Sequence, residues 1–294
     1  EGADWTSCTS ILTRISAVEI TGQSIQRLLK LIKNFSPTLG NGQNINNWSE
    51  IFILISVLQD LSFNTSMNFE ICLPEILYVV SMLIDLGPSK LRVSLHRLLV
   101  NVCSTFIINS SEGSENIKQL TDIIEPLSSQ KAKVLFGFQQ EAEFIHNYTN
   151  ATTLLSKVAF LNQLVNYITC IIRYGSETKS YSTQWQAKYN DLLIETIFGD
   201  SYFLSSRAMI IFSIISRDGV SDELMYKLLT GTMQVLGEPK VTEEGMIYLI
   251  SHMVSYGNFI QGIKTNTALM AQLYWFSFSY LYSPSVILFH AGLL

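Results

Sequence analysis

The chain has 294 residues, of which 48% are hydrophobic and only 15% are charged, and its formal net charge is −5. This composition is too apolar for a disordered chain, and the negative charge argues against partners such as nucleic acid. With 6 prolines and 16 glycines, the chain lacks the frequent turns of an all-β sandwich. Long apolar stretches with few turn residues therefore predict long helices.

No stretch has the pattern of a transmembrane helix, which needs about 20 mostly apolar residues. Residues 273–282 are too few and carry hydroxyls throughout, and residues 71–86 are interrupted by a proline and two acids. The sequence starts at Glu1 without a secretory signal pattern. We expect no transmembrane segment, and we expect both ends to be cuts within a longer protein.

Apolar residues recur at helical spacing along nearly the whole chain. In the first half the expected helices are 11–32, 48–61, 74–84, 91–108, 114–124 and 126–139. In the second half they are 153–173, 182–197, 201–216, 221–236, 242–256, 267–282 and a helix from 284 onward. Ser221 and Thr242 have the side chains of N-caps, and the glycines expected to end helices are Gly175, Gly219, Gly237 and Gly257.

The clearest predicted unit is a pair of helices joined at residues 85–88. Leu73 and Pro74 open the first helix, because proline is tolerated in a first turn where its missing N–H costs nothing. Gly87-Pro88 ends that helix and starts the next, with Gly87 expected at positive φ. So short a turn makes the two helices antiparallel, and we expect Arg92 to reach back to a nearby acid or helix end.

What repeats along the sequence is a unit of two apolar helices and short turns, at about 35 to 45 residues per pair. Such a pair buries its faces only against its neighbours. The predicted fold is therefore all-α, a HEAT/armadillo-like α-solenoid of stacked antiparallel helix pairs. We expect residues 1–294 to be one continuous segment of a larger protein, with a sub-boundary near 139–152.

No residue pattern indicates catalysis, a metal or a cofactor. The histidines are far apart in sequence, and none has a ligand at metal-helix spacing; they are His96, His146, His252 and His290. We interpret His96 as a hydrogen-bonded core or groove residue. The cysteines are scattered, which favours buried thiols in a reducing compartment; they are Cys8, Cys72, Cys103 and Cys170.

Two further patterns have ordinary structural readings. The acid pairs Asp222-Glu223 and Glu243-Glu244 fit the first turns of helices. Aromatic residues alternate with small or polar ones between Phe276 and Tyr282, which could indicate a strand. Their helical flanks favour a packed aromatic helix instead.

The string from Leu73 to Asn101 carries a specific resemblance. It has an apolar helix after Leu-Pro, then Gly-Pro, Leu-Arg, a later His and an Asn, at Leu73, Pro74, Gly87, Pro88, Leu91, Arg92, His96 and Asn101. Further anchors in the same order include Gly137, Trp185 and Arg207. This pattern resembles the helical-repeat region that follows the lipid-binding module of the neurofibromin family, and its fungal homologues in particular.

The resemblance implies a parent protein that stimulates GTP hydrolysis by Ras through a separate module with an arginine finger. That module's Phe-Leu-Arg signature is absent, and Phe203-Leu-Ser-Ser-Arg207 is no substitute because Arg207 matches a repeat-region anchor. The family also implies a cytoplasmic protein, partly peripheral at membranes, whose helical-repeat arms build a homodimer.

We therefore expect a non-catalytic scaffold and dimerisation segment of a Ras regulator, which uses no cofactor. The plainest version of this hypothesis is a simple spacer. The alternative is a helical-repeat adaptor that binds protein or peptide partners without any link to Ras. That function would need a ladder of polar or aromatic residues on successive helices, and Asn101 and Trp185 do not repeat as one. A third option, an all-α enzyme, has no motif to support it.

Overall fold

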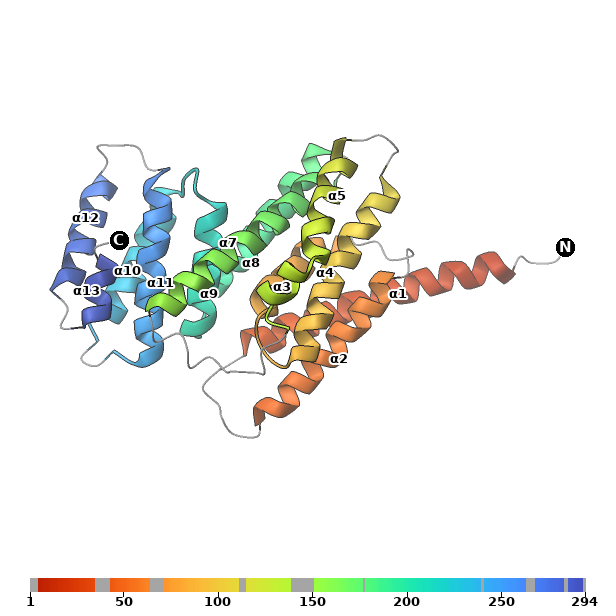
Figure 1. The fold of residues 1–294 in the computed structure, drawn as a ribbon, viewed down its shortest axis with the longest axis horizontal. Helices are drawn as coiled ribbons and strands as arrows, with labels where there is room; N and C mark the ends of the chain where they lie inside the picture. The colour runs from red at the N-terminus through yellow and green to blue at the C-terminus, as the bar shows by residue number, and fades with distance from the viewer. Residues whose placement is uncertain are drawn as a thin grey trace. The chain divides into compact units, whose positions relative to one another are not determined.

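The computed structural model describes residues 5–34, 43–63, 71–110, 115–138, 151–176, 178–238, 241–262, 268–282 and 285–292. Within these ranges the chain forms thirteen helices and no strand (Figure 1). The predicted all-α helical-repeat class is confirmed.

The helices belong to two compact units. The first comprises residues 1–144 and 167–189, and the second comprises residues 145–166 and 190–294. Both units are therefore built from two separate stretches of sequence. That the whole chain is one continuous solenoid stays a prediction, and the expected sub-boundary at 139–152 lies mostly outside the described residues.

The first unit is a two-layer stack. It contains α1 (Trp5–Lys33), α2 (Gln43–Phe63), α3 (Leu73–Leu83), α4 (Ser89–Asn109), α5 (Glu115–Ser128), α6 (Gln130–Leu135) and parts of α7 (Ala151–Tyr174) and α8 (Lys179–Ile197). Helix α1 packs on α3, and α2 packs on α4, while α1 also packs on α2 and α3 on α4. Each of these four helices thus contacts its partner in the pair and the equivalent helix of the other pair, as helical repeats require.

The second unit is arranged around α11. It contains α9 (Tyr202–Ile215), α10 (Asp222–Leu236), α11 (Glu243–Ile260), α12 (Ala268–Leu281) and α13 (Val286–Gly292). Helix α11 packs on both α9 and α13, while α10 and α12 each pack on α11 (Figure 1). The side chains of Ser221 and Thr242 accept hydrogen bonds from Leu224 and Gly245, so both predicted N-caps are confirmed.

Two predicted helix boundaries are wrong. Pro126 does not begin a helix but lies inside α5, close enough to its end that only the last turn loses backbone hydrogen bonds. The helix expected at 126–139 is only α6, Gln130–Leu135. Gly257 lies inside α11 and ends nothing, because apolar packing on both sides of α11 outweighs the low helix propensity of one glycine.

The aromatic segment is a helix, as expected. Residues 268–281 form α12, on which Phe276 and Tyr280 are buried. Among the described helices, one has the length and composition to cross a membrane: α4, Ser89–Asn109. Because 61% of its apolar window is buried inside the protein, α4 has the pattern of a core helix.

Candidate functional site

The anchor residues of the first unit begin at the turn between α3 and α4. Gly87 has φ of 70°, as predicted, and a Cβ atom there would lie 2.7 Å from the ring of Trp48 on α2. Pro88 is the N-cap of α4 in extended backbone. The glycine is therefore needed twice, for its left-handed conformation and for the close approach of the indole.

Four further anchors lie on α3 and α4, and all of them are buried. Leu73 and Leu91 are fully buried, Pro74 lies in the first turn of α3, and the exposed fraction of Arg92 is 4%. Burial lowers the pKa of Arg92, and the charge of Asp85 partly opposes that change. Asp85 is thus the nearby acid that the sequence predicted for Arg92, and Arg92 is buried within the helical repeat.

His96 connects α4 to the end of α5 and the turn beyond α6. Its Nε2 atom lies 2.7 Å from the carbonyl oxygen of Leu127. The carbonyl only accepts, so Nε2 carries the proton. The His96 ring also contacts Phe136 and Phe138, each with a ring-centroid distance of 5.1 Å. Between these two phenylalanines, Gly137 has φ of 67°, so the turn that places both rings on His96 depends on this anchor glycine.

Burial lowers the pKa of His96, although its hydrogen bond to Leu127 opposes the shift. A neutral imidazole whose proton is already donated to a backbone carbonyl is poorly placed as a general base. The interpretation of His96 as a hydrogen-bonded core residue is confirmed.

Asn101 and Trp185 are also used within the first unit. The Nδ2 of Asn101 donates to the Ser62 hydroxyl at 2.9 Å, at the end of α2. Trp185 on α8 is 5% exposed, and its ring centroid lies 5.9 Å from that of Phe106 on α4. Both anchors join helices that are distant in sequence.

Arg207, the remaining anchor, lies in the second unit and in the second turn of α9 rather than at its start. Its exposed fraction is 3%. It lines a cavity of about 10 Å³, which is about the space that one water molecule needs. The other lining residues are Leu161, Phe203, Ser206, Ile210, Ile247 and Ser251.

Comparison with known proteins shows which proteins the chain resembles. No family model matches the chain. Over all 294 residues it is 35% identical to the inhibitory regulator protein IRA2 of Saccharomyces cerevisiae, and 37% identical to the inhibitory regulator protein IRA1 of the same yeast. The chain resembles a segment of neurofibromin-like proteins. It covers 10% of IRA2 and 9% of IRA1, so it spans about a tenth of the length of these relatives.

This similarity confirms the resemblance to fungal neurofibromin-like proteins, and it covers all 294 residues of the chain. The eleven anchors, however, do not form one site. Those of the first unit lie in four places: the start of α3, the α3–α4 turn with the first turn of α4, the His96–Gly137 cluster, and the helix contacts of Asn101 and Trp185. Arg207 lies in the other unit.

In the part of the chain that the structure describes, no group of three or more His, Cys, Asp or Glu residues could hold a metal ion. Burial raises the pKa of the described thiols at Cys72, Cys103 and Cys170, in the case of Cys103 to about 12. Thiols held in the protonated form are weak nucleophiles. His146 and the side chains of Cys8 and His290 lie outside the described residues.

Sequence reasoning missed two buried polar arrangements. On α11, Tyr248, His252 and Tyr256 follow at four-residue spacing, and the first two rings lie 3.9 Å apart between centroids. Tyr256 also shares a 2.7 Å hydrogen bond with Thr232 of α10. The four-residue repeat of ring residues was the available signal, because positions four apart lie on one helix face.

The second missed arrangement is an ion pair inside the first unit. Glu75 lies on α3, where every residue is buried, and its Oε1 is 2.5 Å from Nζ of Lys188 on α8. The signal was an acid in an otherwise apolar helix, which requires a partner. Its partner, 113 positions later in the sequence, could not be named without the fold.

Proposed function

We propose that the chain is a non-catalytic helical-repeat arm of a neurofibromin-like negative regulator of Ras, and that it serves as scaffold and dimer surface. The observation that carries this proposal is the 35–37% identity, over the whole chain, to two yeast proteins whose names describe inhibitory regulators. The buried anchor residues support a structural role, because the contacts described for them join one helix to another.

The burial of Arg207 supports the absence of a GTPase-activating arginine. An arginine finger must project from its protein into the nucleotide site of a partner. Arg207 is 3% exposed and surrounded mainly by apolar side chains of α9 and α11. GTPase activation would then belong to another part of the parent protein, while the arm holds that part in place.

Single-turnover GTP hydrolysis by purified Ras tests this division of labour. The chain and the full-length parent protein are compared at equal concentration. We expect acceleration of roughly 10³–10⁵-fold from an arginine finger in the parent and none from the chain alone. Acceleration by the chain that disappears in Arg207→Ala, with unchanged circular dichroism, would overturn the proposal.

We also propose that the arm contributes to a homodimer of the parent protein, which is cytoplasmic and partly peripheral at membranes.

Charge reversal at Lys118 and Glu125, both exposed on α5, tests one candidate dimer surface. Sedimentation of the parent protein measures its mass. If reversals on every exposed ridge leave both the mass and the regulation of Ras unchanged, the arm is only a spacer. An adaptor without any link to Ras would instead leave Ras regulation intact when the arm is deleted.

A further inference from the structure

One face of α12 is an exposed aromatic ridge, formed by Tyr274, Trp275, Phe278 and Tyr282. The exposed fractions of Tyr274, Trp275 and Tyr282 are 61%, 64% and 77%, and Phe278 is half-buried between them. The rings contact one another along the helix: Phe278 lies 5.9 Å from Trp275 and 5.3 Å from Tyr282 between centroids. So large a contiguous aromatic surface marks an interaction site.

The opposite face of α12 is already buried against the second unit. Phe276 lies 5.6 Å from Tyr256 of α11 between ring centroids, and the Tyr280 hydroxyl donates to the carbonyl oxygen of Leu249 at 3.3 Å. Positions 276 and 280 are separated from positions 274, 278 and 282 by about half a helical turn. Helix α12 therefore has two apolar faces, of which one is covered.

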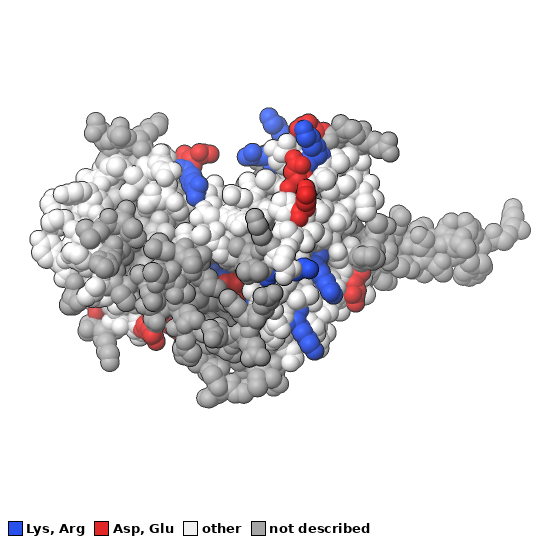
Figure 2. Space-filling model, viewed as in Figure 1, with Lys and Arg blue, Asp and Glu red and all other residues white. Residues whose placement is uncertain are grey.

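A helix that is apolar on all sides is normally buried on all sides. This holds for α3, where all eleven residues are buried, and for α9, where Phe203 to Ile214 are buried. Helix α12 has the same character, since the sequence contains no Asp, Glu, Lys or Arg from Thr265 to Leu294. In Figure 2 the surface over α12 is accordingly without blue or red.

We propose that the aromatic ridge of α12 is the docking face for further helices of the same polypeptide, outside residues 1–294. An uncharged surface that resembles a core cut in half is typical of permanent contacts rather than transient ones. In this unit such contacts are made between alternate helices of the chain, as where α11 packs on α9 and α13. The yeast relatives are about ten times longer than the chain, so a protein of their kind has ample sequence to cover the ridge.

Charge distinguishes this occupant from a lipid surface. The described parts of α12 and α13 carry no lysine or arginine, and basic residues are what bring a protein to anionic membranes. The inference rests on the helical-repeat fold and does not depend on Ras regulation, so either proposal can fail without the other.

Photo-cross-linking in the full-length protein tests the inference. A benzophenone side chain replaces Trp275, and a matched control replaces Tyr226, which is 61% exposed on α10 beside charged neighbours. We expect the probe at 275 to give a cross-link within one polypeptide, to an apolar helix outside residues 1–294. We expect no such product from position 226.

Three results would overturn the inference: a cross-link to lipid, a product of twice the mass from two copies, or a product with another protein. Absence of any product at 275 would also overturn it, because the ridge would then face solvent.

A second variant tests whether the cross-link at 275 arises from accidental proximity. Phe278→Asp places a charge at the centre of the ridge and should abolish the cross-link from position 275, whereas Tyr226→Asp should leave it unchanged.

Discussion

His96 and Leu127 are 31 positions apart in sequence, yet the Nε2 of the imidazole lies 2.7 Å from the Leu127 carbonyl oxygen. The bond joins the middle of α4 to the last turn of α5, where the carbonyl oxygens have no N–H donor four residues later within the helix. A side chain from one helix thus satisfies a carbonyl near the end of the next, so the two helices stabilise each other's position.

Removing this imidazole should destabilise the first unit. We expect His96→Ala to lower the free energy of unfolding by about 1–3 kcal/mol, because it leaves a buried carbonyl without its donor and removes two ring contacts. Urea denaturation followed by circular dichroism measures the change. His96→Gln, which keeps an N–H donor, should retain part of the stability; an equal loss in both variants would contradict the role given to the bond.

The buried imidazole of His252 should make stability dependent on pH. Burial lowers its pKa to about 4, against 6.5 for the ordinary residue. Because the unfolded chain binds this proton more readily, the stabilisation is complete above pH 6.5 and is lost as pH falls towards 4. At about 1.4 kcal/mol per pKa unit, the loss is roughly 3 kcal/mol.

Urea titrations at pH 7 and pH 5 measure this slope. His252→Phe removes this titrating group and should reduce the difference between the two pH values, whatever its effect on stability at pH 7; the remaining slope includes His96, whose pKa is also lowered by burial. The Nδ1 of His252 lies 2.9 Å from the carbonyl oxygen of Tyr248, so some loss at neutral pH is expected from the substitution. An identical pH slope in both proteins would show that His252 does not titrate in the unfolding reaction.

The two glycines at positions 87 and 22 should respond oppositely to alanine. At Gly87 the φ of +70° and the Trp48 ring at 2.7 Å both oppose a Cβ, so Gly87→Ala should cost about 1–3 kcal/mol. At Gly22, inside α1, nothing lies within 4 Å of the added atom, so Gly22→Ala should be neutral or stabilise by up to about 1 kcal/mol. Melting temperatures that shift in the same direction would contradict this contrast.

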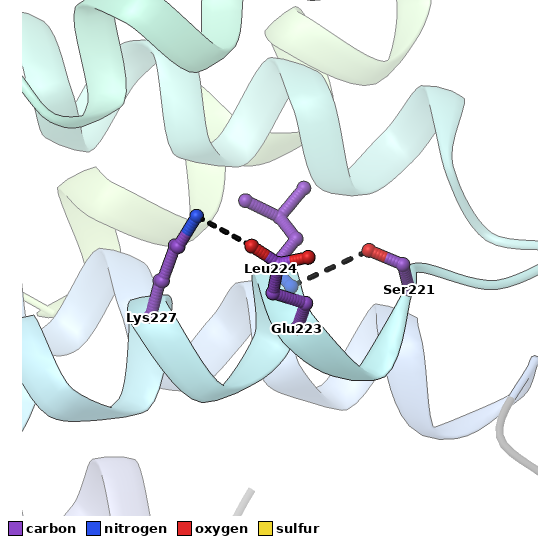
Figure 3. Close-up of polar contacts among 4 residues, drawn as sticks. All are labelled: Ser221, Glu223, Leu224 and Lys227. Atoms are coloured by element: carbon purple, nitrogen blue, oxygen red, sulfur yellow. Dashed lines mark hydrogen bonds and ion pairs between the residues drawn. The ribbon is translucent and has the colours of Figure 1, made fainter.

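Replacing the lysine that pairs with a buried acid should cost more stability than replacing a lysine that pairs with an exposed acid. Lys188 is the partner of buried Glu75, and Lys188→Ala should cost about 1–3 kcal/mol because the carboxylate remains in an apolar helix. Lys227 pairs at 2.8 Å with Glu223, one turn earlier on α10 and near the N-cap Ser221 (Figure 3). Both groups of that pair are exposed, so Lys227→Ala should change stability by less than about 0.5 kcal/mol. Equal losses would place Glu75 in a more solvated environment than the structure gives it.

The helices were largely predictable because each combines an apolar periodicity with a clear boundary. Ser221 and Thr242 are examples, since a capping side chain acts only on the next few residues and leaves a local trace in sequence. Pro126 and Gly257 were mispredicted for the opposite reason. Both are local helix breakers, but Pro126 lies so near the end of α5 that the helix tolerates it, and at Gly257 the packing of α11 on α9 and α13 outweighs the low propensity of glycine.

The contacts that the anchor residues make inside the protein could be predicted only in part. That Gly87 needs positive φ followed from its place between two helices, but the indole of Trp48 above it did not. His96 was expected to be hydrogen-bonded, yet neither Leu127 nor the two phenylalanines around Gly137 could be named. Partners like these depend on which helices become neighbours, and nothing in a local pattern encodes that.

The two compact units interleave along the sequence, and this affects how the protein is made. The first unit includes residues 167–189, so it cannot be complete until those residues have left the ribosome. By then residues 145–166, which belong to the second unit, have already emerged. Domains usually fold one after another from the N-terminus during synthesis. Here part of the second unit emerges before the first one can be completed, so the order of synthesis does not separate the folding of the two units.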